Sequence, residues 1–336
     1  MAVLPADLIH VFAGRDLIGD GVMKLPFLRA LRVAWPRAHI VWLTAGKSVF
    51  GSTLRPLTVD LLDEVIEETG LGISWSDILR SPPALPRADL LIDTQRQVRT
   101  SLVLRRLRPR IFVSAAAGWR LSTLAPTDRG KPPSVIGQMM RLLAACGAAP
   151  DLTQLPRLRL PAEFAHEAAL RLPGEGIRVG LAPGAGDRRK CWPLERYLTL
   201  GATLAERGLR PVMLLGPAEQ GWAEDVTRQL PAAELPVRAE DSPLMTMAIA
   251  RRIAVAVAND SGIGHLLAAA GTPLVSLFGP TSPEKFAPQA THLAILRAQD
   301  FGTEAMAAIP EIAVLKALDP ILLLNDPAVG AGSSAM

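Results

Sequence analysis

The sequence predicts an α/β protein made of two doubly wound domains with parallel sheets. Short strand-like apolar runs, such as 8–13, alternate with segments of helical periodicity, such as 21–36. This alternation begins again after an extended stretch at 149–164 that contains three prolines and is typical of a linker between domains. The chain of 336 residues is also longer than one hydrophobic core usually extends.

We therefore expect a first domain at 1–155, a second domain at 156–318, and a C-terminal segment at 319–336 whose tail is disordered. In the first domain, strands are expected at 8–13, 39–45, 88–94 and 110–115, helices at 21–36, 99–109 and 134–148, a further alternating segment at 59–68, and a loop at 121–133. In the second domain, strands are expected at 177–184, 210–217, 253–258 and 273–279, and helices at 193–208, 219–230, 242–253 and just after 262.

Composition narrows the class of protein. Two cysteines, Cys146 and Cys191, are too few for a disulfide framework, so we expect a reducing, cytoplasmic environment. No apolar run is long enough to span a bilayer, and the first residues lack the basic start of a signal peptide. The histidines are scattered, and neither Cys-x-x-Cys nor Asp-x-Asp occurs, so no metal and no cofactor are expected.

The formal charge of +4 and the pI near 9.4 have two interpretations. An arginine-rich surface in contact with water explains them, and so does attraction to an anionic partner such as a nucleotide, a phosphorylated glycan or the inner leaflet of a membrane. Nucleic acid is not an expected partner, because no basic run is interleaved with aromatic residues.

Strand-to-helix turns are where a doubly wound fold binds its ligands, at the carboxyl ends of the strands. The first such turn, "GRDLIGDG", contains Gly19 and Asp20, and Lys24 follows one helical turn later. By itself Asp20 fits an N-cap. The turn lacks both the Gly-Lys-Ser/Thr ending of a P-loop and the glycine fingerprint of dinucleotide-binding domains.

The turn "LAPGAGDRRKCWP" in the second domain has the residue types of an anion site. Gly184 and Gly186 let the backbone approach a ligand closely, and Lys190 adds a positive charge. A turn that is simply solvated is equally compatible with this pattern. In the next turn, "LLGPAEQ", Glu219 has the position of a ribose-binding carboxylate, but it also fits a first-turn acid that complements the helix dipole.

The stretch "NDSGIGHLLAAAGTPLVSLFGPTSPEKFAP" is the richest in chemistry. Ser261 and Gly262 stand at a helix start, where backbone N–H groups bind anions, and His265 lies one turn further on. Asp260 would repel a phosphate alone. The grouping makes sense for a phosphate joined to a polyol, with the carboxylate binding hydroxyls and the helix start binding the phosphate.

These turns, in this order, resemble glycosyltransferase family 9, the heptosyltransferases of the lipopolysaccharide inner core. The resemblance rests on Gly19-Asp20 with "MKLPFLRALRVAWPRAHI", on "DLLIDTQRQVRTSLVLRRL", on "PGAGDRRKCWPLERY" and "VMLLGPAEQ", and above all on the stretch that begins at Asn259. It implies a GT-B fold, in which two Rossmann-like domains face a cleft and the last helix, here within 304–318, crosses back to the first domain.

The resemblance also implies an activity: metal-independent transfer of a sugar, with inversion, from a nucleotide donor bound by the second domain. Asp20 matches the general base, with Gly19 and Lys24 on the acceptor side. Lys190, Ser261, Gly262 and His265 match the donor-phosphate groups, Asp260 the residue that holds sugar hydroxyls, and Glu219 the residue near the ribose. The implied partners are ADP-heptose and a glycan or lipid-linked glycan, with peripheral contact at the inner membrane.

There are three departures from the family pattern, of which the altered first turn concerns the acceptor side. The first turn carries Arg15 and Asp16 and one extra residue, Ser261 stands where threonine is common, and the cysteines frequent near the family's C-terminus are missing. Two alternatives therefore stay open. One is a nucleotide-sugar epimerase of GT-B fold, and the other is a non-catalytic protein that binds a nucleotide sugar or a glycan.

Overall fold

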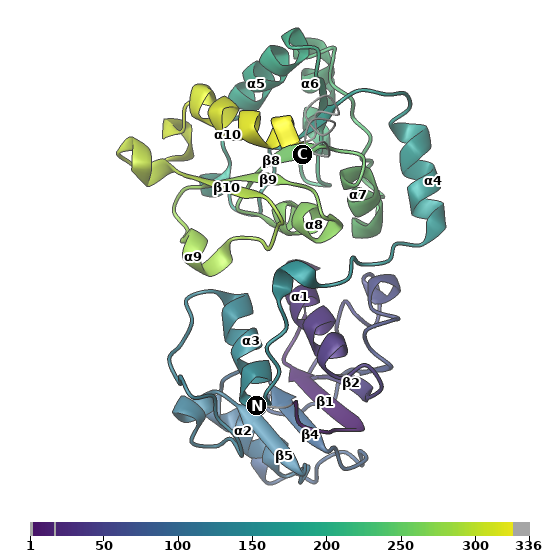
Figure 1. Ribbon diagram of the computed structural model, residues 1–336, viewed down its shortest axis with the longest axis vertical. Coiled ribbons are helices and arrows are strands. Elements are labelled where there is room, and N and C mark those ends of the chain that lie inside the picture. The colour runs from purple at the N-terminus through teal and green to yellow at the C-terminus, as the bar shows by residue number, and fades with distance from the viewer. Residues whose placement is uncertain (1–2, 17, 325–336) are drawn as a thin grey trace, which may run out of the picture. The chain divides into compact units, whose positions relative to one another are not determined.

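The computed structural model describes residues 3–16 and 18–324. The chain divides into two compact units, and the boundary in the sequence lies between Pro156 and Arg157. Each unit contains one five-stranded sheet in which every pairing of neighbouring strands is parallel (Figure 1). The fold class expected from the alternation of strands and helices is confirmed.

The first sheet has the order β3-β2-β1-β4-β5. Its strands are β1 (Leu8–Ala13), β2 (His39–Thr44), β3 (Glu64–Ile66), β4 (Leu90–Asp93) and β5 (Ile111–Ser114), and its helices are α1 (Ile18–Ala34), α2 (Val98–Arg105) and α3 (Val135–Ala145). Helices α1 and α3 pack against each other. A separate apolar cluster joins Phe12 and Leu91 of the sheet to Val103 and Leu104 of α2. The sheet is therefore covered on both faces, which explains why its central strands are almost entirely apolar.

The second sheet has the order β10-β9-β8-β6-β7. Its strands are β6 (Arg178–Ala182), β7 (Arg210–Met213), β8 (Val255–Asn259), β9 (Leu274–Phe278) and β10 (Leu293–Arg297). Its helices are α4 (Ala162–Arg171), α5 (Leu194–Glu206), α6 (Ala223–Gln229), α7 (Pro243–Ala250), α8 (Gly262–Ala270), α9 (Pro283–Phe286) and α10 (Glu311–Leu324). Helix α7 packs with both α4 and α8, and α5 packs with α10.

Short 3₁₀ turns lie in the connections. They are η1 (Arg55–Leu57), η2 (Trp75–Ile78), η3 (Ala116–Trp119), η4 (Leu152–Gln154), η5 (Arg188–Lys190), η6 (Gln220–Trp222), η7 (Ala298–Phe301) and η8 (Met306–Ala308). Within the described part of the chain, no helix combines the length and the apolar composition needed to cross a membrane.

The second unit differs from the expectation in two ways. Strand β10 and helix α4 are elements that the sequence pattern did not predict. Helix α10 continues past the expected boundary at 318 to Leu324. Val314 and Leu318 of this helix belong to the core of the second unit, and the helix contacts β8, β9 and β10 of that unit's own sheet. The expected crossing of the chain's last helix to the first domain stays a prediction. The expected disordered tail lies outside the described residues.

The strand orders locate the switch point of each sheet. In the first unit the order reverses between β1 and β4, and in the second between β6 and β8. Ligands of doubly wound sheets bind beyond the carboxyl ends of the strands at these points. The turns after β1, β4, β6 and β8 are therefore the places to look for function.

Candidate functional site

A charged pair spans the switch point of the second unit. The Nζ atom of Lys190, after β6, lies 2.8 Å from Oδ2 of Asp260, after β8. Thr281, in the turn after β9, donates its hydroxyl to the same oxygen at 2.7 Å. Three turns far apart in the sequence thus meet at one carboxylate. Thr281 was missing from the predicted site, although its place just beyond a buried strand was a usable signal.

Helix α8 begins beside this carboxylate. Ser261 is its N-cap in extended backbone conformation, but the serine hydroxyl does not cap the helix. That hydroxyl oxygen is buried and has no hydrogen-bond partner among the described residues, which is unusual for a buried polar atom. The space beside Gly262 is open, since a Cβ there would have no heavy atom within 4 Å. The helix start therefore keeps its hydrogen-bonding groups free for a ligand.

His265 lies one turn into α8, where the charges of Asp260 and Lys190 both act on its pKa. Burial lowers the pKa of its imidazole, Asp260 acts in the opposite direction, and Lys190 lowers it further. The side chain is therefore neutral at pH 7. A neutral imidazole offers one N–H donor to a ligand but no positive charge. Lys190 can supply the positive charge that the neutral imidazole lacks.

Glu219 lies between two turns of the same edge. A Cβ on Gly184 would be 2.5 Å from the Glu219 carboxyl carbon, and one on Gly216 would be 2.7 Å from its Oε2. Burial raises the pKa of Glu219, and backbone N–H groups of the turn oppose that effect. Gly184, predicted to admit a ligand, thus makes room for this carboxyl group. Gly186 instead faces open space.

Asn259 holds the glycine-containing turn in place. Its side chain is fully buried. The amide donates to the carbonyl of Pro183 at 2.8 Å, and its oxygen accepts from the backbone N–H of Trp192 at 3.0 Å and from the Tyr197 hydroxyl at 3.1 Å. Both ends of the Lys190 loop are therefore tied to the end of β8. This positioning role was not predicted, because nothing local in the sequence reveals it.

The predicted catalytic carboxylate lies in the first unit. Asp20 is in the first turn of α1, partly exposed, and has no hydrogen-bond or ion-pair partner in the residues described. It is inside the helix, so the N-cap interpretation does not apply. Gly19 precedes it and has no heavy atom within 4 Å of a Cβ position. A half-exposed carboxylate without a partner is available to accept a proton.

Lys24, predicted on the acceptor side, has a different neighbour. Its ammonium pairs with the buried carboxylate of Asp16, which also accepts from Trp42 Nε1 at 2.8 Å and from the Ser48 hydroxyl at 3.0 Å. The ammonium also lies 5.8 Å from the centre of the Trp42 ring. Asp16 therefore anchors the end of the β1 turn to the next strand and its loop. The sequence reading noted Asp16 only as a departure from the family pattern.

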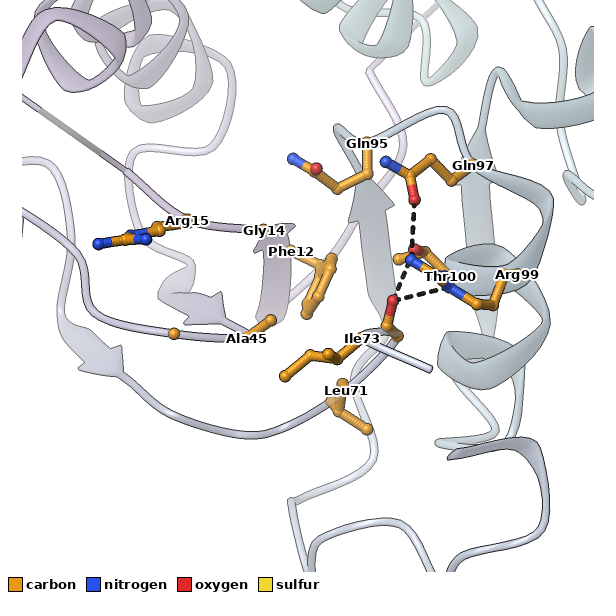
Figure 2. Close-up of a pocket in the computed structure, with 12 residues that line it drawn as sticks. Phe12, Gly14, Arg15, Ala45, Leu71, Ile73, Gln95, Gln97, Arg99 and Thr100 are labelled. Atoms are coloured by element: carbon orange, nitrogen blue, oxygen red, sulfur yellow. Dashed lines mark hydrogen bonds between the residues drawn. The ribbon is translucent and has the colours of Figure 1, made fainter. Parts of the chain in front are cut away.

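A pocket of about 340 Å³ lies at the switch point of the first unit (Figure 2). Its walls come from the turns after β1, β2 and β4, from the loop after β3 and from the start of α2; the residues are Phe12, Gly14, Arg15, Ala45, Gly46, Leu71, Gly72, Ile73, Gln95, Gln97, Arg99 and Thr100. Arg99 donates to the carbonyl of Gly72 at 3.1 Å and to the Gln97 side chain at 3.3 Å. Asp20 is not among the lining residues.

Arg96 stands between the two glutamines of this pocket and is conformationally strained. Its φ of +58° lies in the left-handed region, where a non-glycine residue is held only by its surroundings. Burial lowers the pKa of its guanidinium, yet the described residues include no hydrogen-bond or ion-pair partner for it. Strain together with an uncompensated charge marks this turn as a functional candidate that sequence reasoning missed.

No group of three or more histidine, cysteine, aspartate or glutamate side chains in residues 3–16 and 18–324 is placed to hold a metal ion. The polar groups at the two sheet edges are instead hydroxyls, carboxylates, amides and cations. Such groups suit the hydrogen bonding of an anionic, hydroxyl-rich ligand.

The fold and these groups define the class: a two-domain, doubly wound α/β protein with polar groups at the carboxyl edge of each sheet. The chain belongs to glycosyltransferase family 9 (heptosyltransferase), whose family model matches residues 84–309. Lys190, Glu219, Asp260 and the start of α8 lie inside the matched stretch. Asp20 and Lys24 lie outside it.

Curated relatives and solved structures agree with this family. The chain is 31% identical over 154 residues to lipooligosaccharide heptosyltransferase 2 of Haemophilus influenzae, and 30% identical over 139 residues to lipopolysaccharide heptosyltransferase 2 of Escherichia coli strain K12. The first match covers 44% of either chain, and the second 37% of this chain and 36% of the relative. The matched stretch therefore spans less than half the length of these relatives.

The structural similarity extends over nearly the whole chain. A family 9 glycosyltransferase from Veillonella parvula has a TM-score of 0.73 at 22% identity and covers 95% of this chain and 98% of its own. E. coli ADP-heptose lps heptosyltransferase II has a TM-score of 0.66 at 21% identity, with coverage of 94% and 99%. An E. coli heptosyltransferase solved with ADP has a TM-score of 0.65 at 19% identity, with coverage of 94% and 99%. The protein therefore has the GT-B type of fold, built from two Rossmann-like domains.

Proposed function

We propose that this protein is an inverting, metal-independent glycosyltransferase that moves a heptose, or a related sugar, from ADP-heptose to a lipopolysaccharide-core type of glycan. The observation that carries the proposal is the convergence of Lys190, Asp260 and Thr281 beside the start of α8. The relatives named above are heptosyltransferases, and one neighbour was solved with ADP.

The second domain would bind the donor in three parts. The diphosphate would be bound by Lys190 and by the N–H groups at the start of α8, with Ser261 and His265 as neutral donors. Asp260 would accept hydrogen bonds from sugar hydroxyls, since its carboxylate is held in one orientation by two partners. Glu219 would bind the ribose hydroxyls. All these groups belong to turns at one edge of one sheet.

The first domain would bind the acceptor and supply the base. The pocket at its switch point has amide and guanidinium groups along one side and apolar walls, which suits a glycan with hydroxyl and acidic groups. Asp20 would take the proton of the acceptor hydroxyl as its oxygen bonds to the anomeric carbon. The bond from that carbon to the donor phosphate oxygen breaks, and the electron pair leaves with ADP. Lys190 and the α8 start would stabilise the charge on ADP.

A transfer assay with two aspartate variants tests the base. Asp20→Asn keeps the size of the side chain but removes the basic carboxylate, so turnover should fall by roughly 10²–10⁴-fold while ADP binding stays unchanged. Asp16→Asn serves as the comparison. The Asp16 carboxylate is buried and structural, so its replacement should lower the melting temperature instead of the catalytic rate. Normal turnover in Asp20→Asn would remove the assignment of the base.

Titration with ADP, UDP, GDP, CDP and TDP, followed by thermal shift, tests the donor class. Stabilisation by ADP alone would support the proposed nucleotide, because a ligand that binds only the folded state raises its stability by mass action. A preference for UDP would change the donor. Formation of a product without any acceptor would indicate epimerisation, and the absence of both binding and turnover would contradict the proposal.

A further inference from the structure

An exposed apolar surface lies beside the first-domain pocket, on the loop that carries η2. Leu79 is 87% exposed, Trp75 and Ile73 are each 60% exposed, and Val98 at the start of α2 is also exposed. We call these four residues the Trp75 surface. Isolated exposed apolar side chains are ordinary, but a tryptophan, a leucine and an isoleucine within seven residues of one loop need an explanation.

The loop presents these side chains in a fixed conformation. Ser74 and Asp77 form a capping box around η2, in which the Asp77 carboxylate accepts from the backbone N–H of Ser74 at 2.8 Å. The side chain of Asp77 is itself buried. Arg106 of the α2 end donates to the carbonyls of Asp77 and Arg80. The exposure of Trp75 therefore results from an ordered turn held on α2 and not from a loose loop.

The segment that carries the apolar side chains is rich in arginine. From Leu71 to Arg110 the sequence has eight arginines and three aspartates, an excess of positive charge larger than the net +4 of the whole chain. Two of the three aspartates, Asp77 and Asp93, are buried, and Asp89 accepts the backbone N–H groups of Asp7 and Leu8. Arg80, Arg105 and Arg108 are exposed. Arg80 pairs with Asp77 at 3.2 Å and Arg105 donates to the carbonyl of Leu121 at 2.9 Å, but all three guanidinium groups keep contact with solvent.

We infer that the Trp75 surface docks on a membrane that contains anionic lipid. Tryptophan is suited to the headgroup level of a bilayer, because its ring is apolar and its N–H stays hydrated, while leucine and isoleucine enter the acyl boundary. The flanking arginines are attracted to the negative surface potential of the leaflet. An arginine-rich segment that carries a small exposed apolar group matches this interface better than a protein partner with its own apolar patch.

The Trp75 surface lies next to the pocket that would bind the acceptor. This part of the inference rests on the proposed function. Gly72, Ile73 and Arg99 belong both to the pocket wall and to the loop or helix that carries the Trp75 surface (Figure 2). An acceptor glycan anchored in the bilayer would thus reach the pocket directly from the docked face. The inference names the surface on which the enzyme meets its lipid-linked acceptor.

Vesicle binding by the full chain tests the inference without any transfer assay. We expect co-sedimentation with phosphatidylcholine vesicles that contain phosphatidylglycerol, weaker binding to phosphatidylcholine alone, and a loss of binding as salt rises. The fluorescence of Trp75 should shift to the blue on binding. The other five tryptophans are buried or partly buried, so Trp75→Phe should remove most of that shift.

Paired variants separate the Trp75 surface from exposed apolar residues in general. Trp75→Ser with Leu79→Ser should weaken vesicle binding at least tenfold, and Arg105→Ser should weaken it about fivefold. Val59→Ser and Arg228→Ser remove comparably exposed residues elsewhere and should leave binding unchanged. Equal binding of the Trp75/Leu79 variant and the unchanged protein would overturn the inference.

Two further outcomes are decisive. Self-association without vesicles that disappears in the Trp75/Leu79 variant would overturn membrane docking in favour of a protein interface. A cooperative thermal unfolding transition of the same variants shows that they are folded, and ADP titration tests the proposed function separately. Vesicle binding without any nucleotide response would leave the docking surface standing while the proposed function fails, and the reverse result would separate the two in the other direction.

Discussion

The Nζ atom of Lys190 lies 2.8 Å from Oδ2 of Asp260, although the two residues are 70 positions apart in the sequence. They meet because β6 and β8 are neighbours in the sheet while α5, β7, α6 and α7 intervene in the chain. A diphosphate that binds here would share the ammonium with Asp260. The ion pair therefore holds part of the proposed donor site in place before the donor binds, and it connects the turn after β6 to the turn after β8.

Replacing Lys190 by alanine should weaken ADP binding by about tenfold to a hundredfold, because a hydrogen-bonded charge partner is lost. Isothermal titration calorimetry measures the change. Lys285→Ala is the matched control, since Lys285 is also a lysine near the Phe286 ring, with its Nζ at 4.7 Å compared with 5.8 Å for Lys190. If Lys190→Ala binds ADP as tightly as the unchanged protein and Lys285→Ala do, the phosphate role of Lys190 is wrong.

Removing the hydroxyl of Thr281 should affect the sugar more than the nucleotide. Thr281→Val deletes the hydrogen bond to Asp260 but keeps the shape of the side chain. We expect a donor KM raised about tenfold with ADP affinity almost unchanged, because only the carboxylate that holds the sugar loses its orientation. Thr281→Ser should restore the KM. A valine variant with normal kinetics would show that Lys190 alone is sufficient to position Asp260.

A methyl group at Gly184 should displace the Glu219 carboxyl group, whereas one at Gly186 should displace nothing. The Cβ of Gly184→Ala would lie 2.5 Å from the Glu219 carboxyl carbon, so the carboxyl group must move, but it is the end of a flexible side chain and the stability should fall by less than about 1 kcal/mol. The Cβ of Gly186→Ala meets no heavy atom within 4 Å. Denaturant unfolding measures both effects.

The same clash can be relieved by a second substitution. Gly184→Ala combined with Glu219→Ala removes the group that the methyl would meet, so the double variant should be more stable than the sum of the two single effects predicts. Strict additivity would mean that Glu219 does not lie against this turn in solution.

Histidine titration should make the protein less stable in mild acid. Burial lowers the folded pKa of His265 below its ordinary value of 6.5, and burial has the same leading effect on His10 of β1. The unfolded chain therefore binds these protons at a higher pH than the folded chain. Stability should fall as the pH drops below about 6.5 and be fully present above it.

Unfolding free energies of His265→Gln and of the unchanged protein, measured between pH 8 and pH 5, check this sign. The variant should lose part of the decline, and His10→Gln should lose a separate part, because the two histidines lie in different units. A decline of the same size in all three proteins would assign the pH dependence to other groups.

Local sequence patterns were sufficient to predict the architecture, because buried strands and helices place apolar residues at characteristic spacings. Both parallel sheets, the break near 156 and the turns after β6, β7 and β8 follow from apolar runs that alternate with helical segments. Strand β10 was not predicted, although its run "LAILR" begins with four apolar residues; it is an edge strand and only partly buried. Short helix α4 was hidden by the prolines that precede it.

The residue types at the carboxyl edges of the strands can be predicted from the sequence, since they depend only on where each buried run ends. The pairing of those side chains follows from the packing of the folded chain. Lys24 meets Asp16 instead of standing free, Thr281 joins Asp260, and Glu219 fits against a glycine of another turn. Such pairs depend on strand order and side-chain direction, which residues far apart in the chain set only when they pack together.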